Sequence, residues 1–190
     1  MQRLVCLALP LVLALAPLVY ASETPHANLE LKLEKYQQRL ADAQSERERF
    51  YPLNDIAKLS FELGDHDAAE RFARMALTVA RDYTDDWNYG NAIHDGHMVL
   101  GRVALARGKR EEAKRRLLLA GQTPGSPQLG SFGPNVSLAR DMLDAGELET
   151  VLEYFRLCKL FWKSERRPLE KWLVTLEQGG RPDFDNNLLY

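Results

Sequence analysis

The stretch from His94 to Ala120 carries the clearest helical pattern in the chain. The apolar residues of its first half have helical spacing, because strict alternation of apolar and polar positions fails there. These residues are Met98, Val99, Leu100, Val103, Leu105 and Ala106. Gly108 is typical of the residue that ends a helix in the left-handed conformation. Ala113, Leu117 and Ala120 then form the inward face of a second helix. The stretch predicts one helix–turn–helix unit, with Gly101 at a point where a neighbouring helix approaches closely.

The same frame recurs once upstream and once downstream. Each copy has a small residue within its first helix, a glycine in its turn, and a row of inward residues on its second helix. The small residues are Ala57, Gly101 and Ala139, and the turn glycines are Gly64, Gly108 and Gly146. The inward rows are Ala69, Ala73 and Ala76 in the upstream copy, and Val151, Phe155 and Cys158 in the downstream copy. The turn glycines are about 44 and 38 residues apart, beside about 34 in the commonest repeat of helix pairs. The pattern predicts three helix pairs.

With these features the chain resembles the tetratricopeptide-repeat superfamily, whose signature is a Leu-Gly pair, a turn glycine, and an alanine four positions before a larger apolar residue. Leu100-Gly101, Gly108, Ala113 and Leu117 match it, and the resemblance covers about residues 50–158. The usual early Trp is replaced by Leu53, His97 and Asn135, and the Tyr after Leu-Gly by Ser60, Ala104 and Met142. The resemblance implies an all-α fold, a right-handed α-solenoid of about three helix pairs in residues 50–163. It also implies binding rather than chemistry.

A helix is expected on each side of these pairs. Asn28–Arg49 has one narrow apolar stripe, formed by Leu29, Leu33, Tyr36, Leu40 and Ala43, so residues 22–49 read as a capping helix. The same stripe could instead be the seam of a homodimer. In residues 164–190 we expect a second capping helix, with Leu169, Trp172, Leu173 and Leu176 on its inward face, and a tail from Arg181 with little driving force to fold.

Residues 1–21 have the features of a signal peptide. Arg3 precedes an apolar run from Leu4 to Val19, and Val19-Tyr20-Ala21 presents small residues where a signal peptidase cleaves. Pro10 and Pro17 interrupt the run, which disfavours a helix that spans a membrane. We therefore expect an exported protein, periplasmic or secreted, with no membrane span after cleavage.

Charge and cysteine content narrow the classes of partner. The formal net charge of the whole chain is −2, without the excess of Lys and Arg that is typical of nucleic-acid binding. Cleavage after Ala21 would leave Cys158 as the one cysteine, so no disulfide within the chain is expected. Its register matches that of Ala76 and Ala120, which favours a buried structural cysteine over a reactive thiol.

The strongest candidates for chemistry are His94, Asp95 and His97. The two histidines are one helical turn apart and could share a metal ion, although a stable zinc site needs at least a third protein ligand and no adjacent motif supplies one. The chain has no nucleophile elbow, no HExxH motif and no dinucleotide fingerprint. We therefore predict no catalytic, cofactor-binding or metal-binding residues. A small metal-dependent or histidine-based enzyme remains the alternative.

A row of cations gives the leading hypothesis for binding. Lys58, Arg102 and Arg140 each follow the small residue within the first helix of a pair, a place that points into the groove in tetratricopeptide-like stacking. Asn54, Met98 and Val136 lie one turn earlier, and Asp95 lies nearby as a further groove residue. Such a ladder could hold the carboxylates of an acidic partner peptide. Alternatively, the cations pair with acidic neighbours such as Glu62, Asp95 or Asp144.

Two irregular segments complete the prediction. Trp87 and Tyr89 stand near the start of a helix, where they either pack between adjacent pairs or form a lip on the binding surface. Residues 121–135 (GQTPGSPQLGSFGPN) are rich in glycine and proline, so they are expected to form turns or a loop and no helix.

Overall fold

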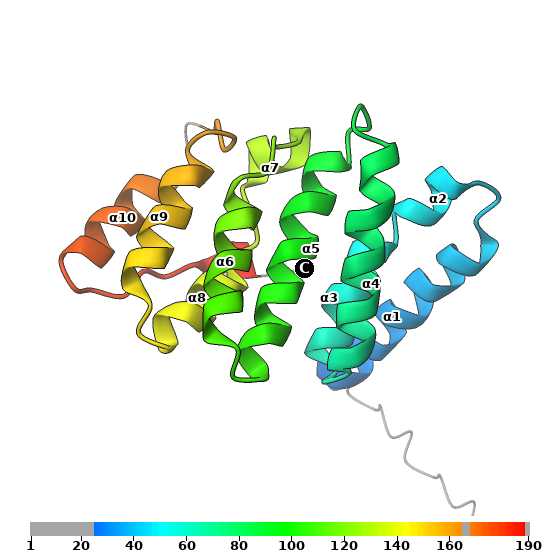
Figure 1. Cartoon of the computed structure of the whole chain (residues 1–190), viewed down its shortest axis with the longest axis horizontal. Coiled ribbons are helices and arrows are strands. Elements are labelled where there is room, and N and C mark those ends of the chain that lie inside the picture. The colour runs from blue at the N-terminus through cyan, green and yellow to red at the C-terminus, as the bar shows by residue number, and fades with distance from the viewer. Residues whose placement is uncertain (1–24, 165–167, 189–190) are drawn as a thin grey trace, which may run out of the picture.

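A computed structural model describes residues 25–164 and 168–188 of the 190, and within these ranges the chain is all-helical, with no strand (Figure 1). The helices are α1 Pro25–Asp42, α2 Glu46–Phe50, α3 Leu53–Glu62, α4 His66–Val79, α5 Tyr89–Ala106, α6 Arg110–Gly121, α7 Pro127–Phe132, α8 Ser137–Asp144, α9 Leu148–Cys158 and α10 Leu169–Glu177, with 3-10 helices η1 Ala80–Asp82 and η2 Asp185–Leu188. No helix in the described ranges combines the length and apolar character needed to cross a bilayer. The predicted signal peptide, residues 1–21, lies outside the described residues.

Three helix pairs, α3/α4, α5/α6 and α8/α9, have turns of the same geometry. Gly64, Gly108 and Gly146 stand in these turns with φ of +83°, +72° and +83°. After each glycine, the next backbone N–H reaches five residues back. These bonds are Asp65 N to Ser60 O at 2.9 Å, Lys109 N to Ala104 O at 2.8 Å and Glu147 N to Met142 O at 2.9 Å. A Cβ at any of the three glycines would meet nothing within 4 Å. The left-handed backbone, rather than lack of space, is therefore what requires glycine.

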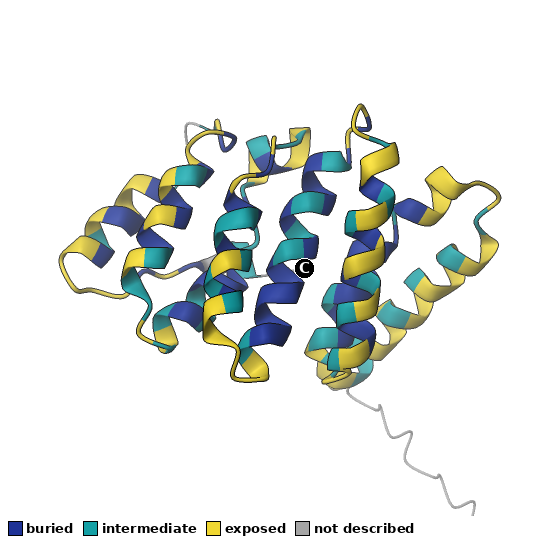
Figure 2. Ribbon diagram, in the orientation of Figure 1, coloured by how far each residue is buried: buried dark blue, intermediate teal, exposed yellow. Residues whose placement is uncertain are grey.

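The helix pairs form a row, and α5 lies between its neighbours (Figure 1). The first helices pack side by side, since α3 contacts α5 and α5 contacts α8. A Cβ on Gly101 would lie 2.2 Å from Leu138 Cδ2, which confirms the close approach predicted at this glycine. Ala69, Ala73 and Ala76 are fully buried along α4, so small residues set the spacing there as well. Figure 2 shows burial concentrated along the middle of the row.

The N-terminal segment forms two helices, so the prediction of one helix over Asn28–Arg49 was wrong. Helix α1 ends at Asp42, and Ser45 begins α2 by accepting a hydrogen bond from Glu48 N at 3.2 Å. A serine that caps a helix competes with helix continuation, and this competition explains the break. Helix α1 contacts α3, yet none of its residues is buried and its apolar stripe is half-buried. Whether the stripe also joins two copies of the chain stays a prediction.

The segment between the second and third pairs contains a helix, contrary to the expectation for residues 121–135. The side chain of Ser126 accepts a hydrogen bond from Leu129 N at 2.9 Å, and Pro127 occupies the first turn of α7. Serine before proline is a favourable helix start, although the overall composition of the segment suggested a loop. Helix α7 ends at Phe132 and is followed by Gly133, whose φ is +86°. It carries Gln128 and Phe132 to the pocket described below.

The C-terminal helix follows the prediction, and the tail does not. Leu169, Trp172, Leu173 and Leu176 are buried, as expected for the inward face of α10. The tail, predicted to have little driving force to fold, returns from α10 toward the middle of the row (Figure 1). Phe184 anchors it, with 3% of its surface exposed and its ring 5.1 Å from that of Trp172.

The largest core cluster joins α6, α8, α9 and α10. Cys158 lies in it and is fully buried, which confirms the structural interpretation of this cysteine. Burial raises the pKa of the Cys158 thiol despite its hydrogen bond with Tyr154. The thiol is therefore protonated and unreactive at neutral pH.

Candidate functional site

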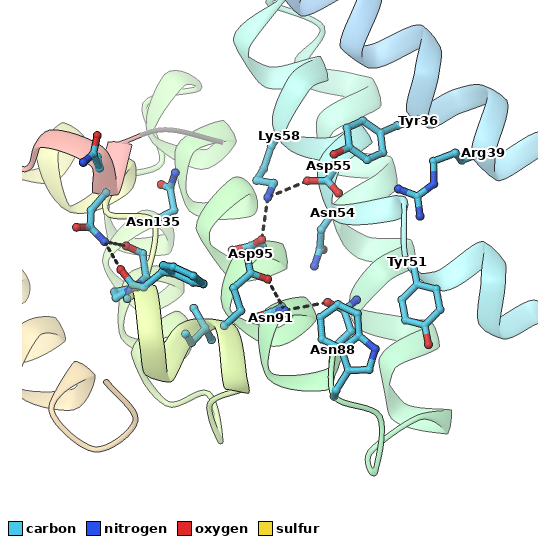
Figure 3. A pocket seen from close by; sticks show the side chains of 18 residues that line it. Tyr36, Arg39, Tyr51, Asn54, Asp55, Lys58, Asn88, Asn91, Asp95 and Asn135 are labelled. Atoms are coloured by element: carbon cyan, nitrogen blue, oxygen red, sulfur yellow. Dashed lines mark hydrogen bonds and ion pairs between the residues drawn. The ribbon is translucent and has the colours of Figure 1, made fainter. Parts of the chain in front are cut away.

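A pocket of about 600 Å³ lies where α1, α3 and α5 meet α7 and the tail (Figure 3). Its volume is in the range of sites that hold small ligands or short peptide segments. Side-chain amides are its most frequent lining groups. They come from Asn54, Asn88, Asn91, Gln128, Asn135, Asn186 and Asn187. The pocket is therefore rich in hydrogen-bonding groups that carry no charge.

Lys58 on α3 is the central cation of the pocket. Its Nζ lies 3.1 Å from Asp55 Oδ1 and 3.0 Å from Asp95 Oδ2, so it joins α3 to α5 (Figure 3). Burial acts to lower the pKa of Lys58, but the two carboxylates outweigh it and raise the pKa above its usual range. Burial likewise opposes ionisation of Asp95, yet the Lys58 ammonium and the His94 N–H hold the pKa of that carboxyl well below its usual range. Both groups are charged across the physiological range of pH.

Asp95 is also bonded to a fully buried histidine. His94 Nδ1 lies 2.9 Å from Asp95 Oδ1, and His94 Nε2 lies 3.0 Å from the Tyr154 hydroxyl. In the neutral ring, Nδ1–H donates to the carboxylate and Nε2 accepts from Tyr154. Burial raises the pKa of Tyr154, so the phenol keeps its proton. This chain of hydrogen bonds through His94 and Tyr154 holds the Asp95 side chain at the pocket wall from the side of the core.

The side-chain amides of the pocket differ in how many of their hydrogen bonds the protein itself supplies. Asn91 Nδ2 donates to Asn88 Oδ1 at 3.0 Å and to Gln128 Oε1 at 3.1 Å, while Asn91 Oδ1 accepts from Ser126. By contrast, Asn54 Oδ1 has no hydrogen-bond partner among the described residues, although only 6% of the residue is exposed. A buried acceptor without a partner costs about 1–3 kcal/mol. Oδ1 exposes less than 1 Å² of surface, so a ligand N–H would reach it after a turn of the Asn54 amide toward the pocket.

Aromatic rings stand at the edge of the pocket. Trp87, which is 54% exposed, stacks on Tyr51 with ring centroids 5.8 Å apart and planes 18° apart. Phe132, at the end of α7, is 78% exposed. Both aromatic rings line the pocket. Trp87 therefore lies exposed at the pocket edge, and its role as the lip of a binding surface stays a prediction.

The pocket brings together three of the six predicted site residues, Asn54, Lys58 and Asp95. Arg102 and Arg140 are not among its lining residues, and both bond to Asp141. The Arg102 guanidinium also pairs with Glu62 and lies 4.2 Å from the centre of the Phe61 ring. Because these contacts hold the cations within the protein, the structure does not form the predicted ladder of groove-facing charges.

Two residues predicted near the ladder lie in the core. Met98 on α5 is 1% exposed and Val136, the residue before α8, is 0% exposed, and both pack in the largest core cluster. Met98 is therefore not placed to contact a ligand in the groove, which corrects the prediction. The alternative, in which the cations pair with acidic neighbours, is confirmed for Glu62, which pairs with Arg102, and for Asp95, which pairs with Lys58. Asp144, the third acidic neighbour named, pairs instead with Arg181.

The two histidines do not share a site. His94 bonds to Asp95 and Tyr154, whereas His97 Nδ1 lies 3.1 Å from Arg116 Nη1. Burial and the nearby Arg116 charge lower the pKa of His97 to about 4. In the described ranges, no group of three or more His, Cys, Asp or Glu side chains is arranged to hold a metal ion.

Other lining residues were missed at the sequence level. Gln128 and Phe132 come from the unpredicted helix α7, and Asn186 and Asn187 come from the tail. Asn187 donates to the carbonyls of Phe132 and Pro134 at 3.2 and 2.9 Å and accepts from Val136 N at 2.9 Å. The only signal in the sequence was the concentration of amides at residues 186–187.

Comparisons with known proteins assign the chain to no family. Protein-family models, curated proteins and solved structures give no match to the chain. The pocket itself therefore carries the functional interpretation.

Proposed function

We propose that the protein is an exported scaffold of three tetratricopeptide-like helix pairs, and that it binds an extended peptide segment of a partner protein in the pocket between α1, α3, α5, α7 and the tail. The three glycine turns support the repeat architecture, since they share one hydrogen-bond pattern. The flanking α1 and α10 then serve as caps at the two ends of the row.

The observation that carries the proposal is Asn54. Its side chain lines the pocket, it is 6% exposed, and its Oδ1 has no partner within residues 25–164 and 168–188. An asparagine amide has the acceptor and donor arrangement of a peptide group, so it can bond to the main chain of an extended peptide whatever its side chains are. Oδ1 exposes less than 1 Å² of surface, and a turn of the Asn54 amide toward the pocket would bring it to a peptide N–H and remove the cost of the unsatisfied acceptor.

The charges of the pocket argue for main-chain recognition rather than for selection of an acidic peptide. The lining residues include two cations, Arg39 and Lys58, and two carboxylates, Asp55 and Asp95. Lys58 is bonded to both carboxylates, so its charge is balanced within the protein. We therefore replace the acidic partner expected from the sequence with one chosen through hydrogen bonds and apolar contacts.

The titratable groups also favour binding over catalysis. A general acid or base works best with a pKa near the working pH. The pKa of Asp95 is lowered and that of Lys58 is raised, so both move away from neutrality. His94 is fully buried behind Asp95.

The test is a selection of random 12-residue peptides on the immobilised protein, followed by fluorescence polarisation with the selected peptides. We expect Asn54→Ala to weaken binding by about tenfold, the equivalent of one lost hydrogen bond to a buried group. Asn28→Ala is the matched control, because Asn28 is exposed on α1 and does not line the pocket. Circular dichroism shows whether each variant is folded. Selection of no peptide, or equal binding by both variants, would overturn the proposal.

A further inference from the structure

The exposed aromatic rings of the described chain gather at one place. Among the large apolar side chains that are exposed in residues 25–164 and 168–188, only Trp87 and Phe132 are aromatic, and both line the pocket. The others are aliphatic: Leu31, Met75, Leu160 and Val174. None of these four lines the pocket. Exposed aromatic faces at a cavity mark a surface that receives a flat apolar group.

The Trp87 ring is held in position before any ligand arrives. It stacks on Tyr51, and the Tyr51 hydroxyl donates to Asp86 Oδ2 at 3.0 Å. Arg47 also bonds to Asp86, at 2.6 Å. Burial opposes ionisation of Asp86, but the Asn88 backbone N–H and Arg47 hold the pKa of that carboxyl below its usual range. The aromatic platform is therefore supported by a charged network on its far side.

The amides beside this platform present donors. Asn91 Nδ2 uses the acceptor oxygens of both Asn88 and Gln128. Among the described residues, the NH₂ groups of these two amides have no acceptor, so they can donate to a ligand. The pocket thus suits a ligand with many carbonyl oxygens and few N–H groups, together with at least one N–H for Asn54 Oδ1.

A neighbouring surface holds one extended segment that contains proline, the chain's own residues 181–184. Pro182 and Phe184 are buried while Arg181 and Asp183 are exposed, an alternation typical of extended chain. Trp172 packs edge-on against Phe184, and its Nε1–H donates to the Asp183 carbonyl at 3.0 Å. Asn186 and Asn187 then line both the pocket and a second cavity of about 480 Å³ beside this segment. An aromatic ring and an N–H donor to a main-chain carbonyl thus hold an extended segment beside the pocket, and the pocket presents groups of the same kinds.

We propose that the pocket binds a proline-containing segment in the extended polyproline II conformation, with proline rings on the Trp87 and Phe132 faces and carbonyls on the Asn88 and Gln128 amides. The inference rests on the proposed function and specifies its ligand. Polyproline II has no internal hydrogen bonds, so its carbonyls are available to such donors. Proline also lacks an N–H, and its fixed φ reduces the entropy lost on binding.

The test counts proline in the peptides selected above and then measures the strongest peptide by fluorescence polarisation. We expect proline to be enriched by about threefold or more over the starting library, and replacement of its prolines by alanine to weaken binding by about tenfold. Trp87→Ala and Phe132→Ala should each weaken binding by about tenfold as well. Leu160→Ala is the control, since Leu160 is 69% exposed and does not line the pocket. It should leave affinity within about twofold.

The outcomes separate this inference from the proposed function. Proline-free peptides that bind through Asn54 would overturn the inference and leave peptide binding intact. Equal binding by Trp87→Ala, Phe132→Ala and Leu160→Ala would also overturn it. Cellohexaose or chitohexaose would be tested in parallel by protection of Trp87 from acrylamide quenching. Protection by a sugar, with no peptide selected, would overturn both proposals.

Discussion

Lys58 Nζ lies 3.0 Å from Asp95 Oδ2, and this ion pair joins the first helices of two neighbouring pairs at the wall of the pocket. Both side chains line the pocket but are largely buried, at 13% and 15% exposed. The pair therefore links the stability of the α3–α5 contact to the shape of the site.

Lys58→Met removes the cation and leaves Asp95 and Asp55 without it. Breaking a buried pair by removal of one partner costs about 3–5 kcal/mol, because the remaining charge stays buried. We expect the free energy of unfolding in urea at pH 7 to fall by about 3 kcal/mol. The double variant Lys58→Met, Asp95→Leu should recover part of this loss, since it buries no unpaired Asp95 charge. A single variant as stable as the normal protein would show that the pair contributes nothing.

Asp95 also makes the stability depend on acid. Its pKa in the folded protein is lowered, while that of an unfolded Asp is about 3.9. The stability from this group is therefore fully present above pH 4 and is lost as the pH falls through the folded pKa. In Lys58→Met the Asp95 pKa rises, so the difference in stability between the variant and the normal protein should narrow below pH 4. Urea titrations at pH 7 and pH 3 measure this difference; an equal difference at both pH values would contradict the assignment.

His97 also makes the protein more stable as the pH rises, as Asp95 does, but over a higher range of pH. Its folded pKa is lowered to about 4, and that of an unfolded His is about 6.5. Between these values the unfolded chain binds more protons, so stability rises with pH across the window. We expect the slope of unfolding free energy against pH between about 4 and 6.5 to decrease in His97→Gln. An unchanged slope would show that His97 titrates normally. The His97 ring signals in an NMR titration give the pKa directly.

The three turn glycines should respond alike to substitution. Gly64→Ala, Gly108→Ala and Gly146→Ala each place an L side chain in the left-handed region, at a cost of about 1–2 kcal/mol. Because a Cβ meets nothing within 4 Å at these positions, the cost comes from the backbone alone. The corresponding changes to Asn should cost less, since Asn tolerates this conformation. Thermal unfolding of the six variants tests the equivalence, and one turn that accepts alanine without loss would break it.

How much of this could be predicted from the sequence depends on the range of the interactions involved. The turn glycines and the inward rows are local features with helical spacing, so residues such as Gly108 and Leu117 marked the helix pairs directly. The approach of Leu138 to Gly101 followed from the same frame. The break in the N-terminal helix depends on one capping side chain, Ser45, whose competition with the helix no periodicity reveals.

The pocket was less accessible to prediction because it is assembled from distant segments. Lys58 was identified as a groove residue, but its pairing with Asp95 across two helices decides what the charge can do. Arg102 has the same register on its own helix, yet it reaches Glu62 and Asp141 instead of the pocket. The contribution of Asn187 depends on the course of the tail, which Phe184 fixes by a contact with Trp172 that no local pattern contains.

The most direct test of the central claim is an NMR titration of the ¹⁵N-labelled protein with a selected peptide, followed through the tryptophan indole N–H signals. The chain has three tryptophans, of which Trp87 lies at the pocket and is 54% exposed, while Trp162 and Trp172 are buried. If the peptide binds in the pocket, the Trp87 signal shifts in proportion to the fraction of protein bound, and the signals of the other two tryptophans keep their starting chemical shifts. A peptide that binds while the Trp87 signal stays unchanged would contradict it.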